Sequence, residues 1–245
     1  MISIKELEVN YENNRRFFCR KRQGQNVIDN LNLKVEKGTC AGIIGESGSG
    51  KSTLAKVICG LLRPTSGSLK IEGTSIYSKK KGGLSTGIVF QDYTSSVNPR
   101  MSVKEIVEES IIAVGRGDHT VSEYLEMVGL DAGFMYRMPH ELSGGQLQRV
   151  CIARALATRA RVLLLDEAVS SLDAHTQLEI MELLKVLKRK YDMTYLFITH
   201  DLLTATFMCD VLHILYRGKI VESCDVSRLS ELRHPYARQL MEAIL

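Results

Sequence analysis

The chain has no tryptophan and only 4 prolines among its 245 residues, and aromatic residues make up just 6% of it. Hydrophobic residues nonetheless account for 44% and charged residues for 24%. This mix is ordinary for a soluble globular protein and excludes the disordered, collagen-like and disulfide-scaffold classes. Because domains typically hold about 100–200 residues, the length predicts one compact body with room for a subdomain.

Long apolar runs and an excess of one charge sign are also missing. The longest apolar runs, at 162–165 and 195–198, are far shorter than the roughly 20 residues that a membrane helix needs. With 32 basic and 28 acidic residues, the net charge of +4 is too balanced to indicate a nucleic-acid binder by itself. The first residues lack the basic start and apolar core of a secretory signal, so we expect a cytosolic location.

Cysteine and histidine patterns that bind metals are absent as well. The six cysteines form no CxxC pair and lie mostly in apolar segments, which favours reduced, buried thiols. The six histidines show neither HxxxH nor HExxH spacing, so a structural metal site is not expected.

The sequence does contain alternating strand and helix patterns on both sides of a helical stretch. Alternating apolar residues predict strands in the first third of the chain, and residues 92–160 are predicted to be mainly helical. Within that stretch, Ser102 with Glu105 and Thr120 with Glu123 have the spacing of capping boxes. This order predicts an α/β fold with a parallel sheet and an inserted helical subdomain. The later predicted elements are strands at 162–165 and 195–199, an amphipathic helix at 175–190, and a hairpin at 211–221. The predicted apolar face of that helix contains Leu178, Met181, Leu184 and Leu187.

A glycine-rich loop lies between a short buried strand at 40–44 and the helix that follows the loop. It matches the pattern GxxxxGK[ST], in which backbone amides and the positive helix N-terminus surround phosphate oxygens. Lys51 is predicted to bridge the β- and γ-phosphates of a nucleotide, and the Ser52 hydroxyl is predicted to bind Mg²⁺. The predicted phosphate-binding residues are Gly45, Glu46, Ser47, Gly48, Ser49, Gly50, Lys51, Ser52 and Thr53.

Two carboxylates follow the apolar strand at 162–165. Asp166 is predicted to hold Mg²⁺ through water, and Glu167 is the candidate general base for a water that attacks the γ-phosphate. An apolar strand that ends in an acidic residue is weak evidence alone. Together with the phosphate-binding loop, it indicates nucleotide hydrolysis.

The segment Leu142, Ser143, Gly144, Gly145 and Gln146 stands before a predicted helix and resembles the LSGGQ signature of ATP-binding cassette (ABC) ATPases. Ser143 can cap that helix, and the two glycines would allow another phosphate to approach its positive end. The resemblance implies a P-loop NTPase fold with a RecA-like core, an early antiparallel β region, and a helical subdomain that carries the signature. The expected division is a core at 1–91 and 161–225, a helical subdomain at 92–160, and a helical tail at 226–245.

Four further residues match positions of the same family. The resemblance implies that Gln91 contacts Mg²⁺ and the attacking water, and that His200 reaches the γ-phosphate. It also implies that Tyr11 stacks on adenine and that Asp173 belongs to the D-loop of the nucleotide site. The motifs occur once each, in the family's order, across nearly the whole chain.

The resemblance also implies cofactors, partners and a location. ATP and Mg²⁺ would bind between two cassettes arranged head to tail, with Ser143 and Gly145 of one covering the nucleotide of the other. The second cassette would be identical or a paralogue. Two transmembrane permease subunits would join them at the cytoplasmic face of the cell membrane, as a peripheral complex, and an extracytoplasmic solute-binding protein would act indirectly.

Within the family, the chain is most similar to the ATPase subunits of bacterial nickel and of di- or oligopeptide importers. The segments that carry this similarity are 95–100, 143–151, 166–170 and 234–238. Many importers have proline at the position of Ala168. The alanine found here resembles the nickel branch. Because the sequence ends at Leu245, we expect the cysteine-bearing extension of some peptide importers to be absent. We therefore expect import of nickel, or of a related metal or metal chelate, with peptide import as the alternative.

A cassette that acts on nucleic acid or ribosomes is a competing class. Its support is the segment 15–22, in which Phe17 and Phe18 lie between basic residues, although a solvated loop explains that segment better. The chain contains neither a second cassette nor a long coiled coil, so no nucleic-acid partner is expected. A regulatory module without turnover is disfavoured because Gln91, Glu167 and His200 are all present.

Overall fold

The computed structural model describes residues 1–11, 26–77, 86–115 and 119–242. These residues form two compact units. The first lies within 1–37, 41–78 and 199–245, and the second within 38–40 and 79–198. The basic segment 15–22 lies outside the described residues. The division into core, helical subdomain and tail stays a prediction.

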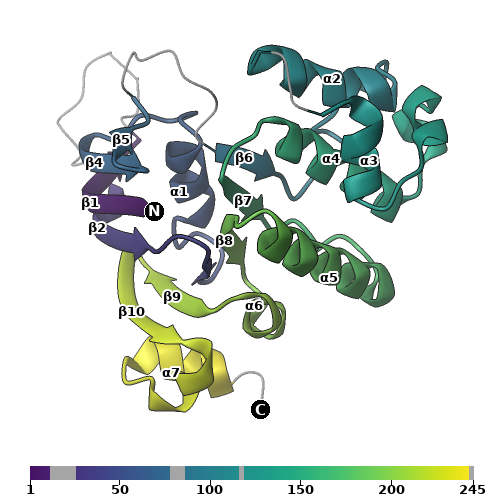
Figure 1. Ribbon diagram of the computed structural model, residues 1–245. Coiled ribbons are helices and arrows are strands. Elements are labelled where there is room, and N and C mark those ends of the chain that lie inside the picture. Colours follow the sequence, from purple (N-terminus) through teal and green to yellow (C-terminus); the bar gives the residue numbers. More distant parts are fainter. Residues whose placement is uncertain (12–25, 78–85, 116–118, 243–245) are drawn as a thin grey trace, which may run out of the picture. The chain divides into compact units, whose positions relative to one another are not determined.

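The first unit begins with an antiparallel sheet in the strand order β2-β1-β4-β5 (Figure 1). In β1, Ile2 pairs with Val35 on one side and with Ile71 on the other, and all three side chains are buried. Alternate residues of a strand point to the same face, so one face of this sheet forms a core. The early antiparallel β region is therefore confirmed. Its strands are β1 (Ile2–Asn10), β2 (Asn26–Val35), β4 (Ser66–Ile71) and β5 (Thr74–Ser75).

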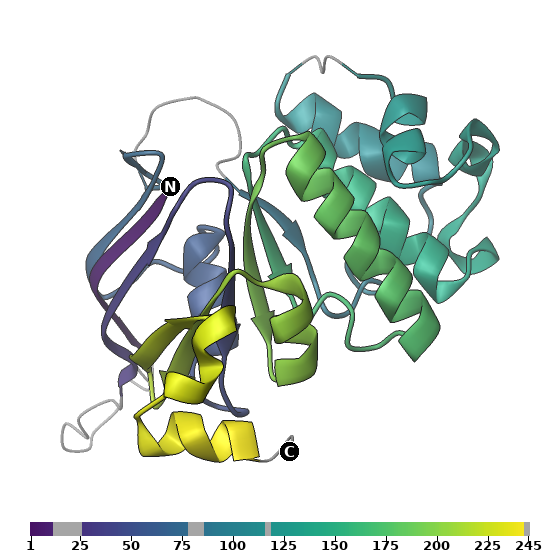
Figure 2. The same cartoon turned by 60° about the horizontal axis from the view of Figure 1, so that its bottom comes forward.

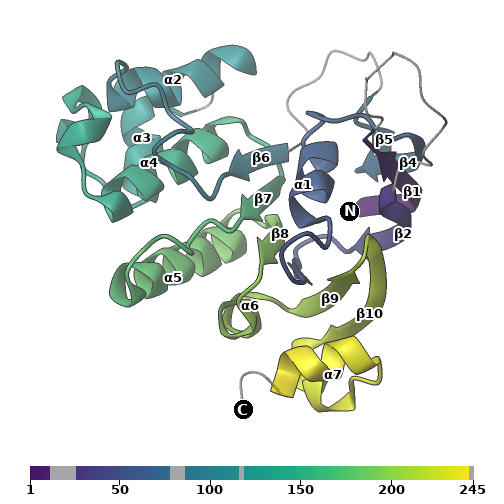
Figure 3. The same cartoon turned by 180° about the vertical axis from the view of Figure 1, so that it is seen from behind.

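The first unit also contains the strand that leads into the phosphate-binding loop. β3 (Cys40–Ile44) pairs in parallel with β9 (Val211–Tyr216), which forms the predicted hairpin with β10 (Lys219–Asp225). All residues of β3 are buried, which explains its continuous apolar run. α1 (Lys51–Ile58) follows the loop. The remaining helices of this unit are α6 (Leu202–Met208), the 3₁₀ segment η3 (Val226–Glu231) and α7 (Pro235–Glu242), with α7 beside β9 and β10 (Figure 3).

The second unit contains a parallel group of strands, β6, β7 and β8, joined by helices. Both predicted capping boxes are present: Ser102 begins α2 and Thr120 begins α3. α4 contacts α2, α3 and α5 (Figure 2). The α/β class with a helical stretch before β7 is confirmed. The elements are β6 (Thr86–Val89), α2 (Val103–Ala113), α3 (Val121–Met127), η1 (Ala132–Tyr136), η2 (Pro139–Glu141), α4 (Gly144–Ala157), β7 (Val162–Asp166), α5 (Ala174–Lys190) and β8 (Thr194–Thr199).

Within the described ranges, none of the helices combines the length and the apolar character needed to cross a bilayer. Cys40, Cys151 and Cys209 are buried, as predicted, whereas Cys59 and Cys224 are half-buried.

Candidate functional site

The loop between β3 and α1 is built to hold an anion. Gly48 and Gly50 adopt positive φ angles of 82° and 111°, which residues with a Cβ rarely adopt. No side chain caps the start of α1, and its first turn contains no acidic residue. The first amides of a helix lack partners inside the helix and carry its partial positive charge. The start of α1 therefore suits a phosphate group.

Lys51 is folded back over this loop. Its side chain is buried, and its Nζ donates hydrogen bonds to the Gly45 carbonyl oxygen at 2.6 Å and to the Glu46 carbonyl oxygen at 2.9 Å. The Glu46 oxygen also accepts from the Ser49 amide at 3.1 Å. The loop thus fixes a cationic amine among its own carbonyl groups, in a position that suits binding to a nucleotide phosphate.

The other loop residues differ in exposure. Ser52 is exposed, whereas Ser49 is buried and its Oγ has no hydrogen-bond partner among the described residues. A Cβ on Gly45 would lie 2.2 Å from the Leu215 carbonyl oxygen of β9, so only glycine fits there. The close packing of β9 therefore fixes where the loop begins.

Tyr11 lies beside the start of α1. Its hydroxyl is 3.3 Å from the Thr53 Oγ1, within hydrogen-bond distance, and its side chain is 49% exposed. An exposed aromatic ring next to the phosphate-binding loop is compatible with stacking on a nucleotide base.

Asp166 and Glu167 stand at the end of β7, in the second unit. Both are half-buried. Glu167 has a φ angle of 47°, in the left-handed region, and its amide donates to the Ile198 carbonyl oxygen at 2.8 Å. A residue with a Cβ adopts this conformation at an energetic cost, and such residues cluster at functional sites. The neighbouring β8 strand thus holds Glu167 in a turned conformation directly after the buried strand.

Ser143 caps α4, as predicted. Its Oγ accepts from the Gln146 amide at 3.3 Å, and the Gln146 Oε1 accepts from the Ser143 amide at 3.0 Å. The pair forms a capping box that the prediction missed, although the S-x-x-Q spacing is a signal for it. A pocket of about 360 Å³ adjoins this helix start, and its lining includes Ser143, Gly145 and Gln146.

The two glycines of the signature pack closely against side chains of the second unit. A Cβ on Gly144 would lie 2.6 Å from the Tyr93 hydroxyl, and a Cβ on Gly145 would lie 2.5 Å from the Thr176 Cγ2. Both distances are shorter than normal van der Waals contact distances. A larger residue here would therefore disturb local packing, besides any effect on the predicted approach of a second nucleotide.

Gly145→Ala is expected to destabilise the protein by about 1–3 kcal/mol, because the added methyl overlaps the Thr176 side chain. Thr176→Ser removes the overlapping methyl, so the double variant should regain thermal stability in a melting experiment. ATPase activity that stays low in the stable double variant would indicate a role of Gly145 beyond packing. A single variant as stable as the wild type would contradict the packing argument.

α4 is linked by side chains to three other segments of the second unit. Gln148 is fully buried and its Nε2 donates to the Ala168 carbonyl oxygen at 2.5 Å, directly after Glu167. Arg154 donates to the Ser96 carbonyl oxygen at 2.5 Å, in the segment that follows Gln91. A third link joins the Arg149 guanidinium to the Val128 carbonyl oxygen at 2.8 Å, where α3 ends. The signature helix is thus connected to the segments that carry Glu167 and Gln91.

The remaining predicted site residues lie at the ends of strands and helices. Gln91 is exposed after β6, and its carbonyl oxygen accepts from the Ser171 Oγ at 3.5 Å. Asp173 caps α5 by accepting from the Thr176 amide at 3.0 Å, and the hydrogen bonds from Thr176 lower the pKa of Asp173. His200 is exposed after β8. The first unit holds Tyr11, the phosphate-binding loop and His200, and the second holds Gln91, the signature, Asp166, Glu167 and Asp173.

Mg²⁺ would be held by oxygen ligands. Within the described ranges, no cluster of three histidine, cysteine or acidic side chains could hold a metal ion by itself. Mg²⁺ prefers oxygen ligands and usually combines one or two carboxylates with phosphates and water. The hydroxyl of Ser52, the amide oxygen of Gln91 and the carboxylate of Asp166 have the right chemistry for such a site.

Known proteins resemble this chain over most of its length. The model of the ABC transporter family matches residues 28–170. The metal-staphylopine import system ATP-binding protein CntF of Staphylococcus aureus is 39% identical, over 99% of this chain and 98% of its own length. The nickel import ATP-binding protein NikE of Brucella suis is 38% identical, over 89% of this chain and 86% of its own. A putative peptide import ATP-binding protein of Brucella abortus is 40% identical, over 89% of this chain and 69% of its own.

Solved structures show the same fold. The dimeric cassette MJ0796, in a post-hydrolysis state with ADP and phosphate, has a TM-score of 0.77 and 30% identity, covering 92% of this chain and 99% of its own. CbiO1 of Clostridium perfringens, part of the transporter complex cbiONQ, has a TM-score of 0.78 and 27% identity, covering 98% of each chain. The chain therefore belongs to the ABC transporter family, as an ATP-binding cassette that hydrolyses ATP.

Proposed function

We propose that this cassette powers the import of a metal ion or metal complex, nickel foremost, through partner membrane permeases. The observation that carries the proposal is the similarity to the metal-staphylopine import protein, which extends over 99% of this chain and 98% of that one. The nickel import protein of Brucella suis supports the same substrate class. Peptide import is the second candidate, favoured by the 40% identity to the Brucella abortus protein.

In the proposed ATPase cycle, the start of α1 and Lys51 bind the phosphates of ATP, and Tyr11 stacks on the adenine. Glu167 accepts the proton of the attacking water, while Gln91 orients that water and His200 contacts the γ-phosphate. Ser52, Asp166 and Gln91 would hold Mg²⁺, which supplies positive charge to the phosphates when bound. Phosphoryl transfer depends mainly on positioning and charge neutralisation, so these roles account for hydrolysis.

We further propose that the chain works as a pair with a second cassette. The start of α4 carries positive helix charge, and Ser143 is exposed there. An exposed helix start of this kind suits the nucleotide of another cassette, as the head-to-tail arrangement requires. The permeases would bind the pair at the cytoplasmic face of the membrane.

Affinity purification of the tagged chain from membranes tests this proposal. We expect two permease subunits, a cassette partner and a solute-binding protein to co-purify, and an unrelated tagged cassette from the same cells serves as control. The recovered solute-binding protein should bind nickel or a nickel complex more tightly than a dipeptide. Preferential binding of the dipeptide would establish the second candidate instead. Recovery of ribosomes or nucleic acid in place of permeases would contradict an import function.

A further inference from the structure

The C-terminal segment of the first unit contacts the phosphate-binding loop through one side chain. Tyr236, in α7, accepts a hydrogen bond from the Glu46 amide at 2.9 Å. The tyrosine is only 7% exposed, and its ring stacks on that of Tyr216 with 4.2 Å between the ring centroids. The contact therefore joins residues 190 positions apart in the sequence.

The hydrogen bond acts on the peptide group that also binds the loop lysine. The Glu46 amide and the Gly45 carbonyl belong to the same peptide group, and the Gly45 oxygen accepts from the Lys51 Nζ at 2.6 Å. This peptide group is thus held on its amide side by Tyr236 and on its carbonyl side by Lys51. Hydrogen bonds arranged in a chain polarise and strengthen one another.

A second contact also holds the loop. The Gly218 amide, in the turn between β9 and β10, donates to the Ser49 carbonyl oxygen at 3.0 Å. This bond uses only main-chain atoms. Tyr236 therefore contributes the side-chain hydroxyl through which α7 fixes the loop.

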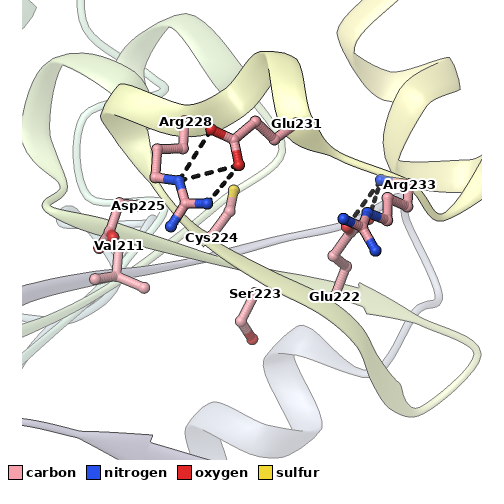
Figure 4. A pocket seen from close by; sticks show the side chains of 8 residues that line it. All are labelled: Val211, Glu222, Ser223, Cys224, Asp225, Arg228, Glu231 and Arg233. Carbon is pink, nitrogen blue, oxygen red and sulfur yellow. Dashed lines mark hydrogen bonds and ion pairs between the residues drawn. The ribbon is translucent and has the colours of Figure 1, made fainter.

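α7 has anchors that do not involve the Tyr236 hydroxyl. The Glu222 carboxylate accepts from the Arg233 amide at 2.8 Å (Figure 4). It also accepts from the His234 amide at 2.8 Å, and so fixes the segment that leads into α7. Burial opposes ionisation of Glu222, but these two hydrogen bonds hold its pKa below the usual value. The apolar contacts of the helix form a cluster of Ile214, Leu232, Tyr236 and Ala237. Removing only the hydroxyl should therefore leave α7 folded and attached.

We propose that Tyr236 is a positioning residue for the nucleotide site, whose hydroxyl holds the peptide group of Gly45 and Glu46 in the orientation that receives Lys51. This inference rests on the proposed role of the loop in binding ATP. A preorganised loop binds its ligand with a smaller loss of conformational freedom. Without the hydroxyl, the Glu46 amide loses its partner and the peptide group can rotate away from Lys51. α7 thereby sets the affinity of the loop for nucleotide.

The test compares Tyr236→Phe with Tyr216→Phe in the full chain. Both variants keep the stacked ring pair, but the Tyr216 hydroxyl makes no hydrogen bond within the described part of the chain. Titration with a fluorescent ATP analogue should show about 5- to 10-fold weaker binding for Tyr236→Phe and wild-type binding for Tyr216→Phe. At saturating ATP, turnover by the assembled transporter should stay near the wild-type value, so that KM changes and kcat does not.

Equal ATP affinity in the two variants would overturn the inference. A wild-type chain that does not bind ATP would instead refute the proposed function of the loop. Glu222→Ala, which releases the start of α7, provides a second route to the same effect. Glu222→Ala should also weaken ATP binding. The double variant with Tyr236→Phe should bind ATP as tightly as the more strongly affected single variant, because both substitutions act through one contact. If the losses of ATP affinity were additive in the double variant, Glu222 would not act through the hydrogen bond of Tyr236.

Discussion

Lys51→Ala is expected to weaken ATP binding by about 100-fold or more, because charge-assisted hydrogen bonds to phosphate oxygens are each worth about 1.5–3 kcal/mol. The Lys51 side chain is only 6% exposed, and its amine is directed by the carbonyl oxygens of Gly45 and Glu46. Alanine removes both the charge and this fixed orientation. Titration of the purified chain with a fluorescent ATP analogue measures the effect.

Lys56→Ala is the matched control for this prediction. Lys56 lies on the same helix, in its last turn, and its side chain is exposed. Its removal changes the net charge by the same amount without touching the loop. A Lys51→Ala chain that binds ATP as tightly as Lys56→Ala, at unchanged thermal stability, would contradict the proposed role of the loop.

Glu167→Gln is expected to lower ATP turnover by about 10²- to 10⁴-fold while ATP still binds, because glutamine keeps the shape of the side chain but cannot accept the proton. The hydrogen bond between the Glu167 amide and the Ile198 carbonyl oxygen uses the main chain, so the substitution leaves it in place. The ATPase rate of the assembled transporter at saturating ATP measures turnover, and nucleotide titration measures binding.

Glu182→Gln controls for loss of a carboxylate in the same unit. Glu182 is exposed on α5, outside every predicted site, and its variant should hydrolyse ATP at the wild-type rate. Hydrolysis by Glu167→Gln at a similar rate would show that another group accepts the proton.

The sequence predicted the features that depend on neighbouring residues. Helix starts at Ser102 and Thr120 are determined by a hydroxyl and a carboxylate three positions apart, and both capping boxes are present. The loop between β3 and α1 is equally local, since Gly48 and Gly50 supply the positive φ angles that the turn needs. Short-range patterns of this kind fix a backbone path without help from the rest of the fold.

Contacts between distant segments could not be predicted from the same patterns. The bonds from Gln148 to Ala168 and from Glu46 to Tyr236 depend on how whole elements pack. Leu178 shows the same limit: predicted for the apolar face of its helix, it is 47% exposed. At 100° per residue, it lies about 130° from the middle of the buried face of α5, which includes Leu184 and Leu187. The apolar stripe alone did not reveal which side of α5 the core covers.

ATP-driven uptake of nickel into sealed vesicles tests the central claim most directly. The vesicles would contain the permeases that co-purify with this chain, together with the cassette pair and the solute-binding protein. We predict nickel accumulation that requires ATP and is lost when Glu167→Gln replaces the wild-type chain, whereas Glu182→Gln supports normal uptake. Vesicles that hydrolyse ATP and take up peptides but no nickel, free or complexed, would contradict the assignment to metal import.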